Sequence, residues 1–492
     1  MPARRRPESR ADESRAASAS AWSALQAAIA GEVILPDSGD YEAAHKSAIA
    51  RFHDVRPEAV VQCQTPHDVA ETISFARLTG LPTATRSGGH CFAGRSSSEG
   101  IVIDVTPMNA VSVSGGAATV GAGARLGEVY DSLYEDGLTI PTGSCPSVGI
   151  AGLTLGGGLG ILGRTYGLTS DQLLAAEVVL ADGRVVECDD NRDHELFWAL
   201  RGAGSGNFGV VTSLVFRTRP ASPATNFHLA WPDPRAAEVI EAWQAWAPAA
   251  PDELYASLLL TAGAEVEEHP RLDLVGSMLG GENDAAALLG EFAVRAGADP
   301  TTDFRKQMSR QETTRYWAAL GTAEGEDEAE QQPPSRHEFP MFKSEFFRRP
   351  LPAEAIAALL ASLAEERVPG QSRELDFTPW GGAYNRIRED ATAFVHRREL
   401  FSLKHTAIVD SDSPKAAKDA ARRWLAKSWS TVRPWGTGRV FPNFPDPDLE
   451  DWSSAYYGTN YQRLRRVKQT YDPANFFRFH QSLANDRPGA LR

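Results

Sequence analysis

Glycine is concentrated between residues 80 and 209 of this chain of 492 residues and becomes thinner afterwards. A glycine has no Cβ atom, so a glycine-rich segment can bring its backbone close to another group and can turn where other residues would be strained. A bound ligand is the usual reason for such a close approach. We therefore expect the first part of the chain to hold a ligand, largely through its backbone.

Composition narrows the classes of protein that the chain can form. Hydrophobic residues make up 42% of the sequence, which is enough for packed cores and excludes a disordered or fibrous protein. The chain carries 50 Lys and Arg against 64 Asp and Glu, a net charge of −14. That charge repels nucleic-acid phosphates, so no nucleic-acid partner is expected. No stretch of about 20 apolar residues occurs, which excludes a membrane span.

The cysteines and the N-terminal segment bear on metal binding and location. The four cysteines are too few for a disulfide framework, and none forms a CxxC pair of the kind that binds zinc, so no metal is expected. They are Cys63, Cys91, Cys145 and Cys188. We interpret residues 1–20 as a disordered tail on a cytoplasmic protein. The alanine-rich residues 16–30 resemble a weak signal-peptide core, which leaves an exported form open.

The pattern of strand-like, helical and turn-rich segments changes twice after the glycine-rich part. From about residue 223 to 433, strand-like runs such as LYASLLL alternate with helical runs such as AAKDAARRWLAKSW, which predicts a separate sheet covered by helices. Within it, the acidic residues 325–334 are interpreted as a solvated loop. Residues 434–492 are again aromatic and turn-rich and include a short basic helix that ends at an Asp-Pro turn.

Two segments of the glycine-rich part carry nucleophilic side chains. Residues 86–98, RSGGHCFAGRSSS, place His90 after a Gly-Gly pair, with hydroxyl residues behind it that can donate to an anion. A histidine that caps a tight turn is the alternative. Residues 141–171 place Cys145 on a turn before two glycine clusters. These clusters match neither the dinucleotide-binding GxGxxG pattern in its strand and helix context nor a phosphate-binding P-loop.

These two segments, with two later ones, resemble the berberine-bridge-enzyme-like flavoprotein oxidases of the vanillyl-alcohol-oxidase superfamily. The four motifs are RSGGH at residues 86–90, GSCPSVGIAGLTLGGGLGILGRTYGL at 143–168, the segment 182–217 that ends in GAGSGNFGVVTSLVFR, and YYGTNYQRLRRVKQTYDPANFFRFHQS at 456–482. The resemblance spans about residues 40–484. It implies an α+β fold in which residues 21–222 and 434–492 form a two-part FAD-binding domain. Residues 223–433 would form a substrate-binding domain, an antiparallel sheet covered by helices.

The resemblance also implies how the cofactor is attached. In the family, the histidine of RSGGH bonds covalently to the 8α carbon of the flavin and the cysteine of GxCPxVG bonds to C6, so His90 and Cys145 would tether one FAD at two points. Both side chains are nucleophiles able to add to an electron-poor ring. Two bonds are expected to raise the reduction potential of the flavin. Cys91, next to His90, is either a packing residue or a competing nucleophile.

The remaining cofactor contacts are expected from the same motifs. The resemblance places residues 202–211 against the FAD pyrophosphate and ribityl chain. Besides the two tethers, the predicted cofactor-binding residues are Arg86, Ser87, Gly88, Gly89, Gly94, Val148, Gly149, Gly152, Gly157, Gly158, Gly204, Gly206, Asn207, Gly209, Val210 and Asn460. In the family, a small branched residue at the position of Val148 resembles a gate that admits oxygen, whereas leucine favours dehydrogenase behaviour. Dioxygen is therefore the expected electron acceptor, and hydrogen peroxide the product.

Oxidation of an alcohol needs a base that takes the hydroxyl proton while a hydride leaves for flavin N5. The resemblance implies a tyrosine of the closing motif, either Tyr456 or Tyr457, and only one of two neighbours in a strand could face the ring. Tyr384, in the strand-like FTPWGGAYNRI, is a third catalytic candidate. Trp380 could stack on a substrate ring, and Lys343 could lower a tyrosine pKa or bind a substrate oxygen. Packing in the core or at an interface is the alternative for each.

The leading hypothesis is a bicovalent FAD-dependent oxidase whose partners are a small-molecule substrate and dioxygen. The substrate would be an alcohol, a sugar lactol or an intermediate of specialised metabolism, bound between the domains over the flavin. A family member that performs oxidative cyclisation or dehydrogenation is the first alternative. A flavin carrier without turnover is the second.

Overall fold

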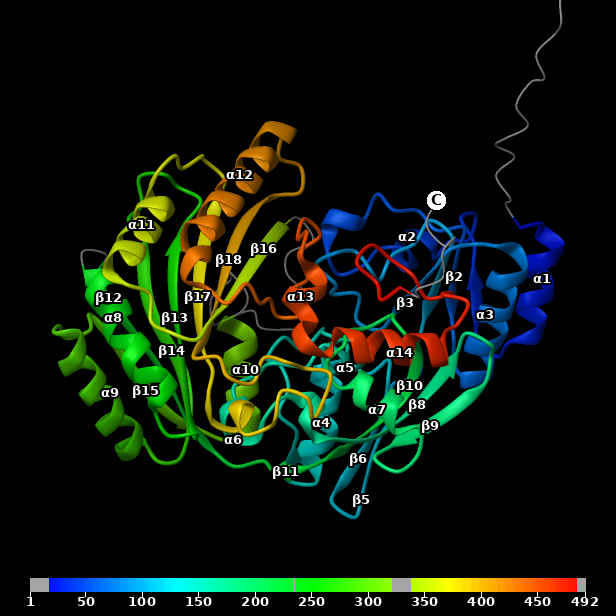
Figure 1. Cartoon of the computed structure of the whole chain (residues 1–492), viewed down its shortest axis with the longest axis horizontal. Coiled ribbons are helices and arrows are strands. Elements are labelled where there is room, and N and C mark those ends of the chain that lie inside the picture. The colour runs from blue at the N-terminus through cyan, green and yellow to red at the C-terminus, as the bar shows by residue number, and fades with distance from the viewer. Residues whose placement is uncertain (1–16, 233–234, 321–337, 485–492) are drawn as a thin grey trace, which may run out of the picture.

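The computed structural model describes residues 17–232, 235–320 and 338–484. The chain forms two bodies that lie side by side (Figure 1). The blue-to-cyan first part and the red last part share one body, and the green-to-orange middle part forms the other. The predicted acidic loop at 325–334 and most of the predicted N-terminal tail lie outside the described residues.

The first sheet of the first body has four strands in the order β1-β2-β4-β3. Strands β2, β4 and β3 are parallel, and β1 is antiparallel to β2. Thr65 and Asp68 form a capping box at the start of the helix that crosses from β2 to β3. The elements are α1 (Ala19–Ala28), β1 (Glu32–Ile34), α2 (Tyr41–Ala44), β2 (Ala59–Gln62), α3 (Pro66–Thr79), β3 (Thr83–Arg86) and β4 (Ile101–Asp104). Helix α1 begins two residues inside the predicted tail, because Ser18 caps it.

The second sheet of this body is antiparallel, in the order β5-β6-β10-β8-β9. Its elements are β5 (Val111–Ser114), β6 (Ala117–Gly121), α4 (Leu126–Glu135), β7 (Leu138–Thr139), α5 (Ile150–Leu155), α6 (Gly163–Tyr166), β8 (Leu173–Leu180), β9 (Val185–Asp189), α7 (His194–Leu200), β10 (Gly209–Arg217) and β11 (Arg219–Pro220). Strand β10 is buried along most of its length, as its run of apolar residues requires.

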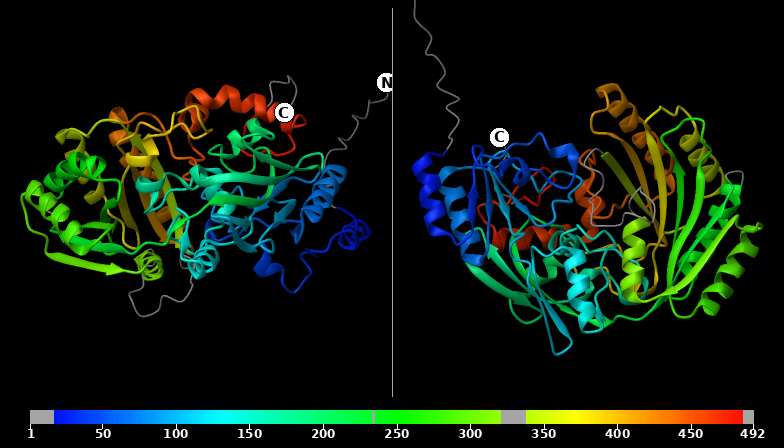
Figure 2. Two further views of the ribbon diagram at one scale, coloured as in Figure 1. Left: turned by 90° about the horizontal axis from the view of Figure 1, so that it is seen from below. Right: turned by 180° about the vertical axis from the view of Figure 1, so that it is seen from behind.

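The second body contains a seven-stranded antiparallel sheet in the order β15-β12-β14-β13-β17-β18-β16. Its strands are β12 (Ala224–Trp231), β13 (Leu254–Ala262), β14 (Arg271–Leu279), β15 (Thr302–Met308), β16 (Glu338–Phe347), β17 (Ser372–Pro379) and β18 (Phe401–Asp410). Helices α8 (Ala236–Trp246), α9 (Glu282–Ala296), α11 (Ala353–Ala364) and α12 (Lys415–Val432) cover one face, while the other face turns toward the first body (Figure 2). Helix α10 (Arg310–Leu320) reaches α4 on that side.

The two faces of this sheet follow the two-residue period of its strands. On β13, Leu254, Ala256 and Leu258 belong to the apolar core beneath the helices. Tyr255 and Ser257 lie between them in sequence and therefore face the first body. The same alternation places Asp376 and Thr378 of β17 and Lys404 of β18 on the face that turns away from the helices, because their neighbours Leu375, Phe377 and Leu403 belong to the core beneath the helices.

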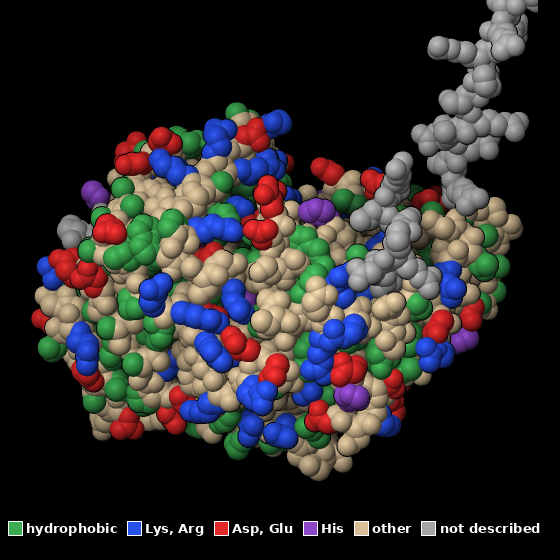
Figure 3. All heavy atoms as spheres, viewed as in Figure 1, with side chains coloured by type: hydrophobic (Ala, Val, Ile, Leu, Met, Phe, Trp, Pro, Cys, Tyr) green, Lys and Arg blue, Asp and Glu red, His purple; other side chains and the backbone are tan. Residues whose placement is uncertain are grey.

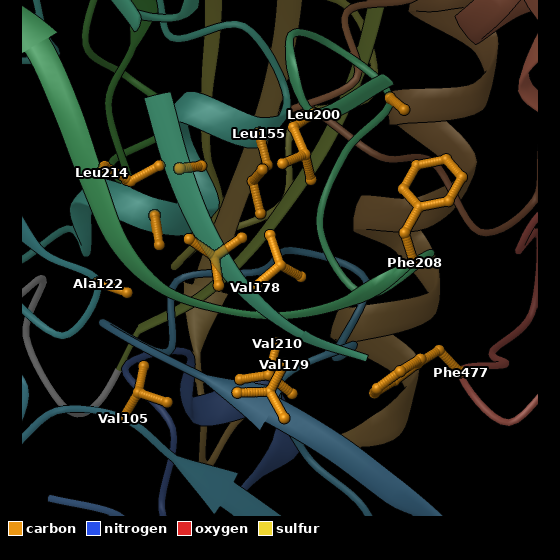
Figure 4. Packing of buried hydrophobic residues seen from close by; sticks show 14 of the residues in the cluster. Val105, Ala122, Leu155, Val178, Val179, Leu200, Phe208, Val210, Leu214 and Phe477 are labelled. Atoms are coloured by element: carbon orange, nitrogen blue, oxygen red, sulfur yellow. The ribbon is translucent and has the colours of Figure 1, made fainter. Parts of the chain in front are cut away.

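The chain returns to the first body through α13 (Trp452–Tyr457) and α14 (Tyr461–Tyr471). Phe477 belongs to the same apolar cluster as Phe208 and Val210 of the first part (Figure 4). The buried Lys468 donates to the carbonyl oxygen of Asn207 at 2.6 Å and to Asp472 at 2.7 Å. The first body is thus built from both ends of the described sequence.

The predicted α+β fold is confirmed, but two local predictions are wrong. FTPWGGAYNRI is not a continuous strand, because β17 ends at Pro379 and residues Gly382–Asn385 form a 3₁₀ turn. Gly381 and Gly382 both have positive φ, which ends the extended conformation there. Tyr456 and Tyr457 lie in helix α13, not in a strand.

On the face shown in Figure 3, acidic and basic side chains are interspersed. Within residues 17–232, 235–320 and 338–484, no helix combines the length and the hydrophobicity that crossing a membrane requires.

Candidate functional site

A cavity of about 450 Å³ lies between the two bodies. The first body contributes the segment after β3, the turn before α5 and the glycine-rich segment that enters β10. The second body contributes Tyr255, Trp317 and Lys404, and the segment 441–445 closes the wall. The cavity therefore has one wall made mainly of backbone and one rich in aromatic side chains.

The backbone wall is held together where two glycines meet. A Cβ atom on Gly88 would collide with the backbone nitrogen of Gly149, and a Cβ on Gly149 would collide with Gly88 and with the Ser87 side chain. The Ser87 hydroxyl is itself fixed, since it donates to the carbonyl oxygen of Ala122 at 2.7 Å. Only glycine at both positions allows the two segments to lie this close.

This contact brings the two predicted nucleophiles onto one wall. His90 Nε2 lies 3.0 Å from the hydroxyl oxygen of Ser147, and Cys145 Sγ lies 3.4 Å from the same oxygen. Burial, and then the positive charge of Arg125, lowers the pKa of His90 to about 4. The imidazole is therefore neutral at pH 7 and retains a lone pair for bond formation.

Comparison with known proteins identifies the family. The model of an FAD binding domain matches residues 57–189, and the model described as berberine and berberine like matches residues 440–484. The uncharacterized FAD-linked oxidoreductase YgaK of Bacillus subtilis (strain 168) is 32% identical over 92% of this chain and 97% of that protein. The chain belongs to the berberine-bridge-enzyme-like family. It is an FAD-dependent oxidoreductase.

Two further proteins resemble this berberine-bridge-enzyme-like chain over most of its length. The aclacinomycin-N/aclacinomycin-A oxidase of Streptomyces galilaeus is 31% identical over 87% of this chain and 85% of that protein. The solved structure of the xylooligosaccharide oxidase from Myceliophthora thermophila C1, in complex with xylobiose, has a TM-score of 0.83 at 25% identity. The match covers 96% of this chain and 100% of that one. Carbohydrate oxidases are therefore among its relatives.

The cofactor of this family fits polar atoms that the protein leaves free. Among the described residues, the hydroxyls of Ser96 and Ser97 and the Nε of Arg95 are buried without a hydrogen-bond partner. Ser96 and Arg95 line the cavity, and Arg95 and Ser97 line an adjoining cavity of about 260 Å³. Donors of this kind bind the oxygens of a pyrophosphate. These residues would hold the phosphate groups of FAD.

The structure places most of the predicted cofactor residues on the cavity wall. The lining includes Arg86, Ser87, Gly88, Gly89, His90, Cys145, Val148, Gly149, Gly152, Gly204, Gly206, Gly209 and Val210. Gly94 instead lines the adjoining cavity. Arg86 also braces the segment, because its guanidinium donates to the carbonyl oxygens of Ser96 and His45 at 3.1 and 2.9 Å.

Four other predicted cofactor residues lie outside this lining. Gly157 and Gly158 are absent from it, and a Cβ at either would meet Phe394 or Thr169. Asn207 accepts a hydrogen bond from the backbone nitrogen of Leu483 at 3.1 Å and so ties the two parts of the first body together. Asn460 donates to the carbonyl oxygen of Glu389 at 2.7 Å and belongs to the contact between the bodies.

The two tyrosines of the closing motif do not reach the cavity lining. The Tyr457 hydroxyl donates to the carbonyl oxygen of Ala203 at 2.9 Å, and burial raises its pKa to about 12. The Tyr456 hydroxyl accepts from the backbone nitrogen of Asp446 at 2.8 Å, and burial raises its pKa as well. Both side chains are buried in the apolar core of the first body. The motif is helical where a strand was expected. The structure gives neither of them the position of a base.

Tyr384 and Trp380 are also packing residues. The Tyr384 hydroxyl donates to the carbonyl oxygen of Gly160 at 3.2 Å, and the ring leaves no room for a Cβ on Gly163. Trp380 stacks on Tyr384 with ring centroids 4.4 Å apart and donates to the carbonyl oxygen of His396 at 3.1 Å. Both are fully buried at the contact between the bodies, and neither lines the cavity.

Lys343 lies on the helix-covered face of the sheet rather than on the cavity face. It pairs across strands with His405, which contacts Ser428 of α12, and its ammonium lies over the Trp429 ring. Its Nζ donates to Asp446 at 2.6 Å. Phe342, the preceding residue in sequence, takes the opposite face and packs on Phe92. Lys343 therefore does not line the cavity, and its position gives no support to the predicted substrate contact.

The aromatic wall was not predicted. It consists of Tyr255, Trp317, Phe441 and Phe444, with Lys404 and Asn443 as polar members. Tyr255 and Lys404 stand on regular strands, where alternation marks them as facing away from the helices. Whether these side chains face the backbone wall depends on how the two bodies pack. Local sequence patterns do not indicate that packing.

Proposed function

We propose that this oxidoreductase holds FAD through covalent bonds to both His90 and Cys145 and oxidises a hydroxyl-bearing substrate, an alcohol or a sugar lactol, with dioxygen as the electron acceptor. The observation that carries the proposal is the Ser147 hydroxyl, which lies 3.0 Å from His90 and 3.4 Å from Cys145 on one cavity wall. Two nucleophiles sharing one hydroxyl are placed to react with a single ring.

The attachment balances with dioxygen as oxidant. At each point, a bond from His90 nitrogen or Cys145 sulfur to a flavin carbon replaces one N–H or S–H hydrogen and one flavin C–H hydrogen. The two protons and two electrons that are released convert one dioxygen to hydrogen peroxide. His90 needs no prior deprotonation, since its pKa of about 4 keeps it neutral at pH 7.

The substrate would lie against the aromatic wall. Tyr255, Trp317, Phe441 and Phe444 present flat apolar faces on which a sugar ring or an aromatic ring stacks. FAD, when bound, accepts a hydride from the carbinol carbon and passes two electrons to dioxygen. The overall change is alcohol plus dioxygen to carbonyl compound plus hydrogen peroxide.

Val148 supports dioxygen as the acceptor. It lines the cavity close in sequence to Cys145, and its side chain is smaller than the leucine that favours dehydrogenase behaviour in the family. Relatives that carry the name oxidase include the aclacinomycin and xylooligosaccharide enzymes.

The attachment is tested by acid precipitation of the wild-type protein, His90→Ala, Cys145→Ala and the double variant, followed by peptide mass mapping. We expect the wild-type pellet to be yellow, with one flavin joining the peptides that contain His90 and Cys145. Each single variant should retain one bond, and the double variant should release all flavin into the supernatant. Complete release by either single variant would overturn the double attachment.

The reaction is tested by mixing the wild-type protein anaerobically with xylobiose, cellobiose, lactose, cinnamyl alcohol and aclacinomycins N and A. We expect at least one donor to bleach the flavin band, and readmitted air to restore it with one hydrogen peroxide per turnover. Flavin that no donor reduces would support a carrier. Flavin that a donor reduces but air does not reoxidise would make the protein a dehydrogenase.

A further inference from the structure

A set of polar side chains crosses three neighbouring strands on the cavity face of the seven-stranded sheet. Tyr255 and Ser257 stand on β13, Asp376 and Thr378 on β17, and Lys404 on β18. The Ser257 hydroxyl donates to the Tyr255 hydroxyl at 2.8 Å, and the Thr378 hydroxyl donates to Asp376 Oδ1 at 3.1 Å. The Thr378 side chain also interacts with the Tyr255 hydroxyl. These groups form a path that leads from Tyr255 through Thr378 to a carboxylate.

Lys404 holds the carboxylate end of this path. It stands directly opposite Asp376 in the strand pairing, and its Nζ lies 3.1 Å from Asp376 Oδ2. Its second carboxylate neighbour, Glu374, lies at 3.6 Å. Although burial opposes the charged form, these two carboxylates raise the pKa of Lys404, so its ammonium has no lone pair with which to accept a proton.

Tyr255 lies at the end of this path that reaches the cavity. Its ring packs against Ile161 and Leu162 of the first body and meets Trp317 edge-on at 6.0 Å. It is 8% exposed, and it lines the same cavity as His90. Among the described cavity-lining residues of the second body and of the segment 441–445, it is the one whose side chain can both accept and donate a proton.

We infer that Tyr255 is the catalytic acid–base residue of the oxidation and that Thr378 and Asp376 receive the proton it passes on, with Lys404 balancing the charge. This inference rests on the proposed oxidation of a hydroxyl group. The resemblance implied that Tyr456 or Tyr457 takes the hydroxyl proton. We assign this role instead to Tyr255, on β13 of the second body.

The proton passes along these groups in order. As the hydride leaves the carbinol carbon, the substrate hydroxyl proton moves to the Tyr255 oxygen, the phenol proton moves to Thr378, and the Thr378 proton moves to Asp376. Tyr255 and Thr378 end as they began, and Asp376 is protonated. Because burial raises the pKa of Tyr255 to about 12, a relay through the neutral phenol suits neutral pH better than a free tyrosinate.

The test is the rate of anaerobic flavin reduction in Tyr255→Phe, measured by stopped flow with whichever donor of the panel reduces the wild-type protein. We expect the limiting rate to fall about 100-fold or more. The half-saturating donor concentration, the covalent flavin content and the rate of reduction by dithionite should change little. The matched control is Tyr166→Phe, since Tyr166 packs against the same apolar cluster but does not line the cavity.

The relay is tested separately, so that the inference stays falsifiable if Tyr255→Phe fails to bind flavin. Thr378→Ser retains the hydroxyl and should keep a rate within about 3-fold of wild type, whereas Thr378→Val should lose about 10-fold or more. A wild-type rate in Tyr255→Phe, or equal rates in the two Thr378 variants, would overturn the inference and leave the proposed function intact. A wild-type protein that no donor reduces would instead overturn the proposed function, and this inference with it.

Discussion

The contact between Gly88 and Gly149 sets the separation of the two cofactor-binding segments at the scale of single residues. Each glycine occupies space that the backbone of the other segment would deny to any larger residue. His90 lies two positions after Gly88, and Cys145 lies four positions before Gly149. The shared hydroxyl of Ser147 is reached by both nucleophiles because the two segments are pressed together.

Gly149→Ala should therefore destabilise the protein and disturb the proposed attachment of the flavin to His90 and Cys145. We expect the free energy of unfolding in urea to fall by about 3 kcal/mol, because the added methyl group meets backbone that cannot rotate away. Covalent flavin content should fall with it. Gly39→Ala is the control, since a Cβ there meets nothing within 4 Å, and it should change stability by less than about 0.5 kcal/mol. Equal effects of the two variants would contradict this reading.

The positions of His90 and Cys145 on one cavity wall could be predicted, because each lies in a short glycine-rich segment whose local conformation places it there. Tyr255 was missed for a physical reason. Its segment, LYASLLL, identifies a strand and even its two faces, but the polar face acquires a function only when the other body packs against it. For Lys343, the strand was predicted but its register was not, and that register turns the side chain toward α12.

Among the elements, β16 pairs with the segment that follows α12, and this pairing positions the residues that complete the cavity wall. After α12, the backbone nitrogen of Thr437 donates to the carbonyl oxygen of Phe346 at 2.9 Å. The backbone nitrogen of Phe346 donates to the carbonyl oxygen of Arg439 at 3.0 Å. Glu345 supports this pairing through one carboxyl oxygen, which accepts from Gly438 at 2.6 Å. Phe441 and Phe444 enter the cavity a few residues later. Burial raises the pKa of Glu345 to about 8.

This raised pKa makes stability depend on pH. The folded protein holds the Glu345 proton up to about pH 8, whereas the unfolded chain releases it near its ordinary pKa of 4.5. The stabilisation is therefore complete below about pH 4.5 and is lost as the pH rises to about 8, by up to roughly 1.4 kcal/mol per pH unit. Glu345→Gln should flatten this slope in urea unfolding measured from pH 5 to 9. An unchanged slope in the variant would contradict the assignment.

Element predictions succeeded where periodicity alone decides the structure, as in the strands and helices of the middle part. They failed where a turn interrupts an apparently regular pattern. FTPWGGAYNRI alternates like a strand, yet two successive glycines with positive φ turn it into a 3₁₀ segment, and the Gly-Gly pair was the available signal. For Tyr456 and Tyr457, the Trp452–Tyr457 segment is too short for helical period to show in the sequence.

At the scale of the whole molecule, buried arginines join the two bodies. Arg397 of the second body forms a bidentate pair with Asp171 of the first, at 2.7 and 2.8 Å, and both side chains are nearly inaccessible to solvent. Arg164 of the first body donates to the carbonyl oxygens of Leu254 and Ala250 of the second, at 2.9 and 2.6 Å. These contacts keep the aromatic wall opposite the backbone wall.

Asp171→Asn should leave Arg397 as an uncompensated buried charge. We expect it to lower the free energy of unfolding by about 3–5 kcal/mol. Asp190→Asn is the matched control, because it breaks an Arg–Asp pair with Arg201 in which Asp190 is 76% exposed, and it should cost less than about 1 kcal/mol. Urea unfolding of both variants measures the difference. Similar losses in the two variants would show that burial of the pair does not govern its contribution.

The division of the first body between two distant stretches of sequence has a consequence for biosynthesis. On the ribosome, the segments that carry His90 and Cys145 emerge long before Lys468 and Phe477, which complete the same core. The whole second body is made in between. We therefore expect nascent chains that stop before α13 to bind flavin poorly, even though both nucleophiles are already present. Flavin binding would then follow completion of the polypeptide.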